Sequence, residues 1–127
     1  KGYVLASVGA YTDNVAYTCY QALKSYIDEN DEQIINFTKA IAESLIWVNT
    51  SSAEKIALSI KDFFKETDIT VLTKAIQRYK DIEAWSMTPY LDEAEFKHLQ
   101  NILISSKELD KYMPYSILVQ NKYSTKR

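Results

Sequence analysis

The sequence predicts a mainly α-helical chain with two short β-strands near its N-terminus. The 127 residues include only 2 glycines and 2 prolines, which is too few for the many tight turns of an all-β domain. After Gln21, apolar residues recur at spacings of three and four, which is the helical period. Two early stretches are instead short and rich in β-branched and aromatic residues, as strands are.

The two predicted strands cover residues 3–8 and 15–20, with a loop at residues 9–14. An isolated pair of strands leaves backbone donors and acceptors unpaired and is marginal in water. We therefore expect these strands to join a larger sheet, either in a longer protein or in a complex with another chain. The first residue, Lys1, is not Met, which fits a removed N-terminal segment or a piece of a longer chain.

Helices are expected along the rest of the chain, and each has a recognisable start. The expected starts are Gln21, Asn30, Ser51, Thr67 or Asp68, Asp92 and Pro114. Three of these positions have Gln or Glu three residues later, which is the spacing of a capping box. Proline suits the first turn of a helix. The polar tail from Gln120 is expected to be frayed.

The apolar stripes of these helices predict the core. The residues expected to be buried are Phe37, Ile41, Leu45, Ile60, Leu72, Ile76, Leu99 and Leu103. Trp47 and Trp85 are both expected to pack against this core. Trp85 lies in a loop, however, and could instead contact another lobe of a larger protein.

Charge and residue chemistry exclude several function classes. The 15 basic and 17 acidic residues are interspersed, so a nucleic-acid interface is not expected. Cys19, the only cysteine, is predicted to be a buried free thiol, because neither a base nor a second cysteine accompanies it. His98, the only histidine, is expected to have a solvated or capping role. No catalytic residues, metal or cofactor are expected.

A set of short motifs, in this order and spacing, resembles the C-terminal region of nitrate/sulfonate/taurine substrate-binding proteins of ABC importers. The matching positions are Tyr17-Thr18, Asn30, Phe37-Thr38-Lys39-Ala40-Ile41, Trp47-Val48, Phe64, Thr67-Asp68, Ala75-Ile76, Arg78-Tyr79-Lys80, Ile82, Trp85, Pro89, Phe96, Leu99-Gln100, Ile102-Leu103, Pro114-Tyr115, Leu118-Val119 and Asn121. The chain departs from the family pattern at Ala16 and Asp31, where proline is usual.

This resemblance implies the C-terminal segment of a two-lobed α/β fold of the periplasmic-binding-protein type. Residues 1–20 would form a hinge and strand region, and residues 21–127 the helical part of a solute-binding lobe. The solute, a sulfonate, nitrate or a vitamin precursor, would contact Tyr11, Thr12, Asn14 and Tyr17. The partner would be an ABC transporter permease, and the protein would be extracytoplasmic, in the periplasm or anchored at the cell surface as a lipoprotein.

Two other functions stay open. Pyrimidine synthases of thiamine biosynthesis share this fold, so an enzyme is the first alternative. Such enzymes need sites rich in histidine and cysteine, and this chain has one of each. The second alternative is a free-standing helical interaction domain. As an isolated fragment of the solute-binding protein, the chain is expected to associate with itself through unpaired strand edges.

Overall fold

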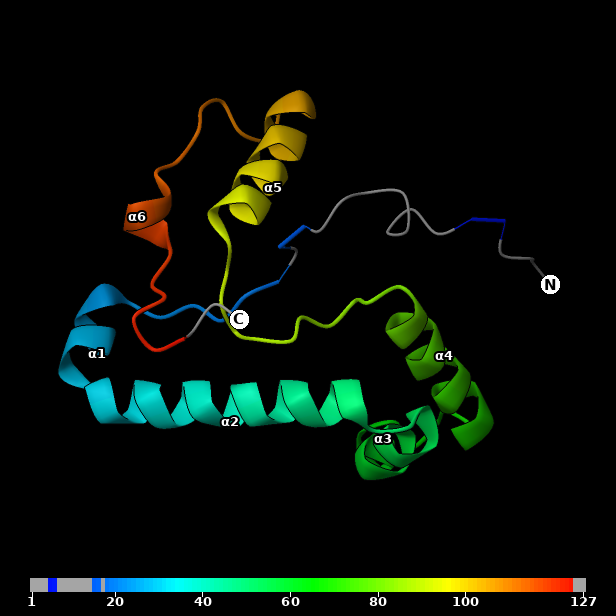
Figure 1. Ribbon diagram of the computed structural model, residues 1–127. Helices are drawn as coiled ribbons and strands as arrows, with labels where there is room; N and C mark the ends of the chain where they lie inside the picture. The colour runs from blue at the N-terminus through cyan, green and yellow to red at the C-terminus, as the bar shows by residue number, and fades with distance from the viewer. Residues whose placement is uncertain (1–4, 7–14, 17, 125–127) are drawn as a thin grey trace. The chain divides into compact units, whose positions relative to one another are not determined.

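The computed structural model describes residues 5–6, 15–16 and 18–124, and its ordered elements are helices (Figure 1). They are α1 (Lys24–Glu29), α2 (Asp31–Thr50), α3 (Ala53–Ile60), α4 (Ile69–Asp81), α5 (Glu93–Ser105) and α6 (Tyr115–Leu118). A 3-10 turn, η2 (Lys61–Phe63), continues α3.

The predicted fold class is wrong, because the described part of the chain is all-α and contains no strand. Leu5, Ala6, Val15, Ala16 and residues 18–20 have no regular secondary structure. The other residues of the two predicted strands lie outside the described ranges. A strand needs a neighbouring strand for its backbone hydrogen bonds, and the described residues offer none. Leu5 is 98% exposed, so apolar character alone did not create a strand there.

Most helix starts agree with the predictions. The side chain of Ser52, rather than Ser51, accepts a hydrogen bond from the backbone N–H of Lys55. Asp92 accepts one from the N–H of Ala94, and Pro114 directly precedes α6. The side chains of Ser52 and Asp92 each satisfy a donor that the first turn of a helix leaves free.

Asp68 and Asn30 show two different kinds of capping. Asp68 accepts a hydrogen bond from the N–H of Thr70 at 2.7 Å, and this bond lowers the pKa of the Asp68 carboxyl. Asn30 does not use the predicted capping box. Its side-chain amide instead donates to the carbonyl of Tyr26 at the end of α1, and the Tyr26 hydroxyl donates to Gln33.

The described residues group into two compact units. One combines the described residues up to 35 with residues 90–124, and the other comprises residues 36–89. We refer to them as the terminal unit and the central unit. The boundary expected between residues 20 and 21 is a different division and stays a prediction.

The central unit contains the buried hydrophobic residues of the described chain. They come from α3 and α4, which lie side by side (Figure 1): Ala53, Ile56, Ala57, Leu72 and Ile76. Trp47 and Trp85 pack against them, as predicted. Trp85 also lies 5.6 Å from the ring of Tyr79, centre to centre.

The predicted core is therefore confirmed only in part. Leu72 and Ile76 are buried, whereas Phe37 is 46% exposed. The other five predicted core residues, Ile41, Leu45, Ile60, Leu99 and Leu103, are half-buried. The stripe along α2 is apolar, but this helix meets the central core mainly through Trp47 and Val48 at its C-terminal end.

Candidate binding pocket

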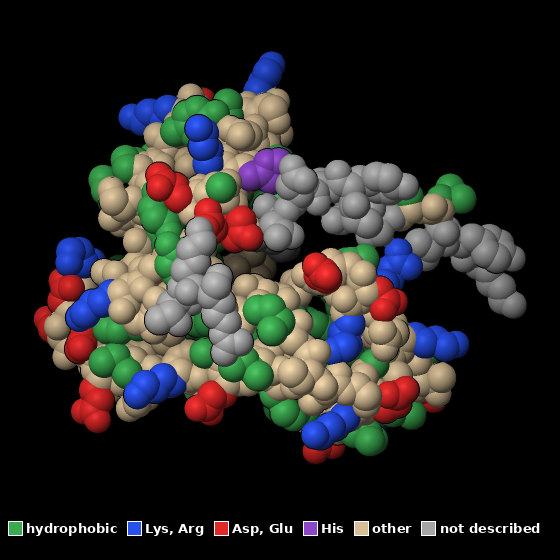
Figure 2. Space-filling view, viewed as in Figure 1, with side chains coloured by type: hydrophobic (Ala, Val, Ile, Leu, Met, Phe, Trp, Pro, Cys, Tyr) green, Lys and Arg blue, Asp and Glu red, His purple; other side chains and the backbone are tan. Residues whose placement is uncertain are grey.

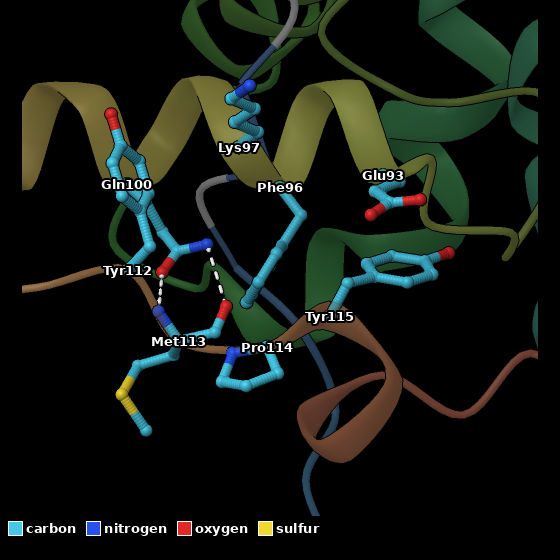
Figure 3. Close-up of a pocket in the computed structure, with 8 residues that line it drawn as sticks. All are labelled: Glu93, Phe96, Lys97, Gln100, Tyr112, Met113, Pro114 and Tyr115. Atoms are coloured by element: carbon cyan, nitrogen blue, oxygen red, sulfur yellow. Dashed lines mark hydrogen bonds between the residues drawn. The ribbon is translucent and has the colours of Figure 1, made fainter.

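The terminal unit contains a pocket of about 370 Å³ between α5 and the segment that leads into α6 (Figure 3). Its lining residues are Glu93, Phe96, Lys97, Gln100, Tyr112, Met113, Pro114 and Tyr115. The first four come from α5, which presents them at spacings of three and four. The other four follow one another along the chain.

Gln100 joins the two walls of this pocket. Its side-chain Nε2 donates to the backbone carbonyl of Met113 at 3.2 Å, and its Oε1 accepts from the backbone N–H of Met113 at 2.5 Å (Figure 3). The residue is only 5% exposed, and it is the one buried polar residue in the described chain. Since both ends of the amide are occupied, Gln100 fixes the shape of the pocket rather than offering a free polar group to a ligand.

Phe96 and Tyr115 form an aromatic wall. Their ring centres are 5.8 Å apart with an angle of 64° between the ring planes, an edge-to-face arrangement that aromatic pairs favour. The hydroxyl of Tyr115 donates to the carbonyl of Leu91 at 2.5 Å. Burial raises the pKa of Tyr115, and the hydroxyl of Tyr90 raises it further, so Tyr115 remains a neutral donor at ordinary pH.

Asn121 completes this polar arrangement from the C-terminal tail. Its side-chain Nδ2 donates to the carbonyl of Leu91 at 2.9 Å and to the hydroxyl of Tyr115 at 2.6 Å. Its Oδ1 accepts from the N–H of Leu91 at 3.2 Å. The tail is therefore held in place at this position, whereas the sequence predicted a frayed end.

The pocket is suited to an apolar or aromatic group. Phe96 extends from α5 toward Pro114, and the ammonium group of Lys97 is directed away from the segment that contains Pro114 (Figure 3). The hydroxyl of Tyr112 donates to the side chain of Asn101 at 2.6 Å. Apolar walls with a polar rim favour occupants that bury carbon surface.

The four predicted solute contacts, Tyr11, Thr12, Asn14 and Tyr17, lie outside the described residues and stay predictions. The pocket was missed at the sequence level. The uncharged run from Tyr112 to Asn121 could not have indicated it, because residues 2–12, 14–23 and 44–53 form uncharged runs of equal or greater length.

Cys19 and His98 both differ from expectation. Cys19 is exposed rather than buried, because its segment is not a strand covered by a sheet. The Nε2 atom of His98 is shielded from solvent, and no hydrogen-bond partner for it is found in the described part of the chain. The expected solvated or capping role is therefore wrong for this nitrogen.

The described residues hold no group of three or more His, Cys, Asp or Glu side chains that could bind a metal ion. They also hold no helix that is both long enough and apolar enough to cross a membrane.

The chain is 39% identical over 125 residues to a protein of Bacillus subtilis (strain 168) named "Putative binding protein YtlA". The aligned stretch is 98% of this chain and 37% of YtlA, so the chain spans little more than a third of the length of that relative. No protein-family model and no solved structure matches the chain.

Proposed function

We propose that this chain is part of a solute-capturing protein that serves an ABC importer of the nitrate, sulfonate, taurine or vitamin-precursor type. The observation that carries the proposal is the 39% identity to YtlA over 98% of the chain. That protein is named for binding and not for catalysis, which favours a non-enzymatic role. The resemblance of the ordered sequence motifs to those of importer substrate-binding proteins supports the proposed transporter class.

The proposed solute contacts are Tyr11, Thr12, Asn14 and Tyr17. Hydroxyl and amide groups donate hydrogen bonds, and the oxygen atoms of sulfonate and nitrate accept them. Charged acceptors make such bonds shorter and stronger. A permease would then receive the solute outside the cytoplasm, which makes an extracytoplasmic location part of the same proposal.

The test uses a chimera in which this chain replaces the matched stretch of YtlA. Calorimetry with taurine, nitrate and a thiamine-pyrimidine precursor should show binding of one of them with a Kd of roughly 1–10 μM, which corresponds to about −7 to −8 kcal/mol. The 127-residue chain alone should bind the same compound at least about a hundredfold more weakly, because it supplies only part of the enclosing walls.

Two asparagine variants of the chimera locate the site. Asn14→Ala should weaken binding at least about tenfold, since it removes a proposed solute contact. Asn36→Ala is the matched control, because Asn36 is exposed on α2. No binding of any of the three compounds, or equal affinities for the two variants, would contradict the proposal.

A further inference from the structure

The pocket beside α5 is preformed, because hydrogen bonds within the terminal unit hold both of its walls. Gln100 bonds to both backbone groups of Met113, and the hydroxyl of Tyr115 donates to the carbonyl of Leu91. The volume of about 370 Å³ lies within the range of small-molecule sites. A small ligand could therefore bind without first ordering the walls, which favours affinity.

Three aromatic side chains line this pocket: Phe96, Tyr112 and Tyr115. The face of an aromatic ring carries a partial negative charge, so it attracts cations as well as apolar groups. Several aromatic rings around one pocket are an arrangement by which proteins recognise ammonium ligands. The aromatic lining alone would accept a neutral ring equally well, so the charge of the occupant depends on the other lining residues.

Glu93 adds a full negative charge to the same pocket. Figure 3 shows its side chain on the side of α5 that faces Tyr115. Lys97 has the spacing of a helical ion-pair partner, four positions later, but its ammonium group is directed away (Figure 3). Within the described part of the chain Glu93 makes no ion pair. Its carboxylate is therefore available to a positively charged ligand.

The hydroxyl of Tyr115 is affected by the same negative surroundings. Burial raises its pKa most, the Tyr90 hydroxyl raises it next, and the charges of Asp92 and Glu93 raise it further. On the molecular face drawn in Figure 2, by contrast, charged side chains of both signs are interspersed. Selection for a cation is therefore a local property of the pocket.

We infer that this pocket binds a small organic ammonium compound with an aromatic or other apolar body. The ammonium group would lie between the Glu93 carboxylate and the ring of Tyr115, and the apolar body against Phe96 and Pro114. A neutral compound would gain the apolar contacts alone, and an anion would be repelled by Glu93. The inference concerns a second site and does not depend on the solute contacts proposed within residues 11–17.

Three probes of similar size separate these contributions: phenethylammonium, the neutral 2-phenylethanol and the anionic phenylacetate. Their affinities for the isotope-labelled 127-residue chain are measured by nuclear magnetic resonance titration. We expect a Kd of roughly 0.1–1 mM for phenethylammonium. The alcohol should bind at least about threefold more weakly, because it lacks the ion pair and the cation–π contact. Shifts of the backbone amides of Phe96, Gln100 and Met113 would locate the probe in the pocket.

Two glutamate variants distinguish Glu93 from the general charge of α5. Glu93→Gln should weaken phenethylammonium binding about threefold and narrow its preference over 2-phenylethanol, because only the charge is removed. Glu95→Gln is the matched control, since Glu95 lies in the same first turn of α5 but does not line the pocket. Both variants lose one negative charge near the start of the helix, and circular dichroism checks that both retain their helices.

Three outcomes would overturn the inference. The first is that neither the 127-residue chain nor the YtlA chimera binds phenethylammonium. The second is equal affinity for the ammonium compound and the alcohol. The third is equal weakening by Glu93→Gln and Glu95→Gln. A chimera that binds taurine or nitrate but not phenethylammonium would contradict this inference and leave the proposed function standing.

Discussion

The ammonium group of Lys80 caps the C-terminal end of α2 by donating to the backbone carbonyl of Val48 at 2.8 Å. It also donates to the carbonyl of Asn49 at 3.0 Å. These carbonyls belong to the last turn of α2, where no intrahelical donor is available. A cation at this end also interacts favourably with the helix dipole. The long α2 is thereby joined to α4 within the central unit.

Lys80→Met should lower the free energy of unfolding by about 1–2 kcal/mol, because two charge-assisted hydrogen bonds are lost while the apolar stem is kept. Urea denaturation followed by circular dichroism measures this change. Lys74→Met is the matched control on the same helix, since Lys74 is exposed. Equal losses for the two variants would show that the capping bonds contribute nothing.

Ile56→Ala should be much more damaging than Leu58→Ala, although the two residues are two positions apart on α3. Ile56 is 3% exposed and lies in the central core, so its truncation should cost about 2–5 kcal/mol. Leu58 is largely in solvent, and its truncation should cost less than about 1 kcal/mol. Thermal unfolding compares the variants, and similar midpoints would mean that α3 does not pack as described.

The helix starts could be predicted from the sequence because their signals are local. The carboxylates of Asp68 and Asp92 act within two residues along the chain. The hydroxyl of Ser52 acts within three residues, and it lies one position after the predicted cap, Ser51. The presence of strands could not be predicted from such local signals. A strand depends on a partner that its own sequence does not specify.

The polar contacts that shape the candidate pocket were also beyond prediction. Gln100 bonds to a residue 13 positions away, and Asn121 to one 30 positions away. Spacing along the sequence carries no information about such pairs. The backbone conformation just beyond α4 and α5 was not predictable either. Glu83 and Lys107 have positive φ angles of 50° and 63° there, at positions where glycine is usual.

The contact between Asp31 and Lys122 should make stability depend on pH at both extremes. The Lys122 ammonium lies 2.5 Å from Asp31 Oδ1, and the Tyr123 hydroxyl donates to the same oxygen. The bonds to Lys122 and Tyr123 lower the pKa of Asp31, and the bond to Asp31 raises the pKa of Lys122. The contribution of Asp31 is therefore present above pH 3.8 and lost as pH falls through its lower folded pKa.

At the alkaline end, the contribution of Lys122 is present below pH 10.5 and lost as pH rises through its higher folded pKa. Asp31→Asn should flatten both limbs of a plot of thermal midpoint against pH. The control is Glu32→Gln, which removes a neighbouring carboxylate that makes no ion pair in the described residues. Since both groups are exposed, 0.5 M salt should reduce the effect. Unchanged limbs in Asp31→Asn would refute the assignment.

Gln100 offers the sharpest test of the pocket wall, because it uses a donor and an acceptor on one backbone residue, Met113. Gln100→Leu keeps most of the volume but leaves both backbone groups without their partner, and should cost about 1–3 kcal/mol. Gln100→Glu retains an acceptor for the Met113 N–H. An ionised carboxylate cannot donate to the Met113 carbonyl, so it is repelled there.

Protonation should restore the missing donor in Gln100→Glu. Burial and the facing carbonyl raise the folded pKa of the introduced carboxyl above the ordinary glutamate value of about 4.3. The variant should therefore approach the parent in stability below that value, and lose stability as pH rises through the folded pKa. Gln100→Leu should show no such recovery relative to the parent. Urea midpoints at pH 4 and pH 8 distinguish the two variants. A constant difference between Gln100→Glu and the parent would mean that the bond to the Met113 carbonyl does not hold the wall.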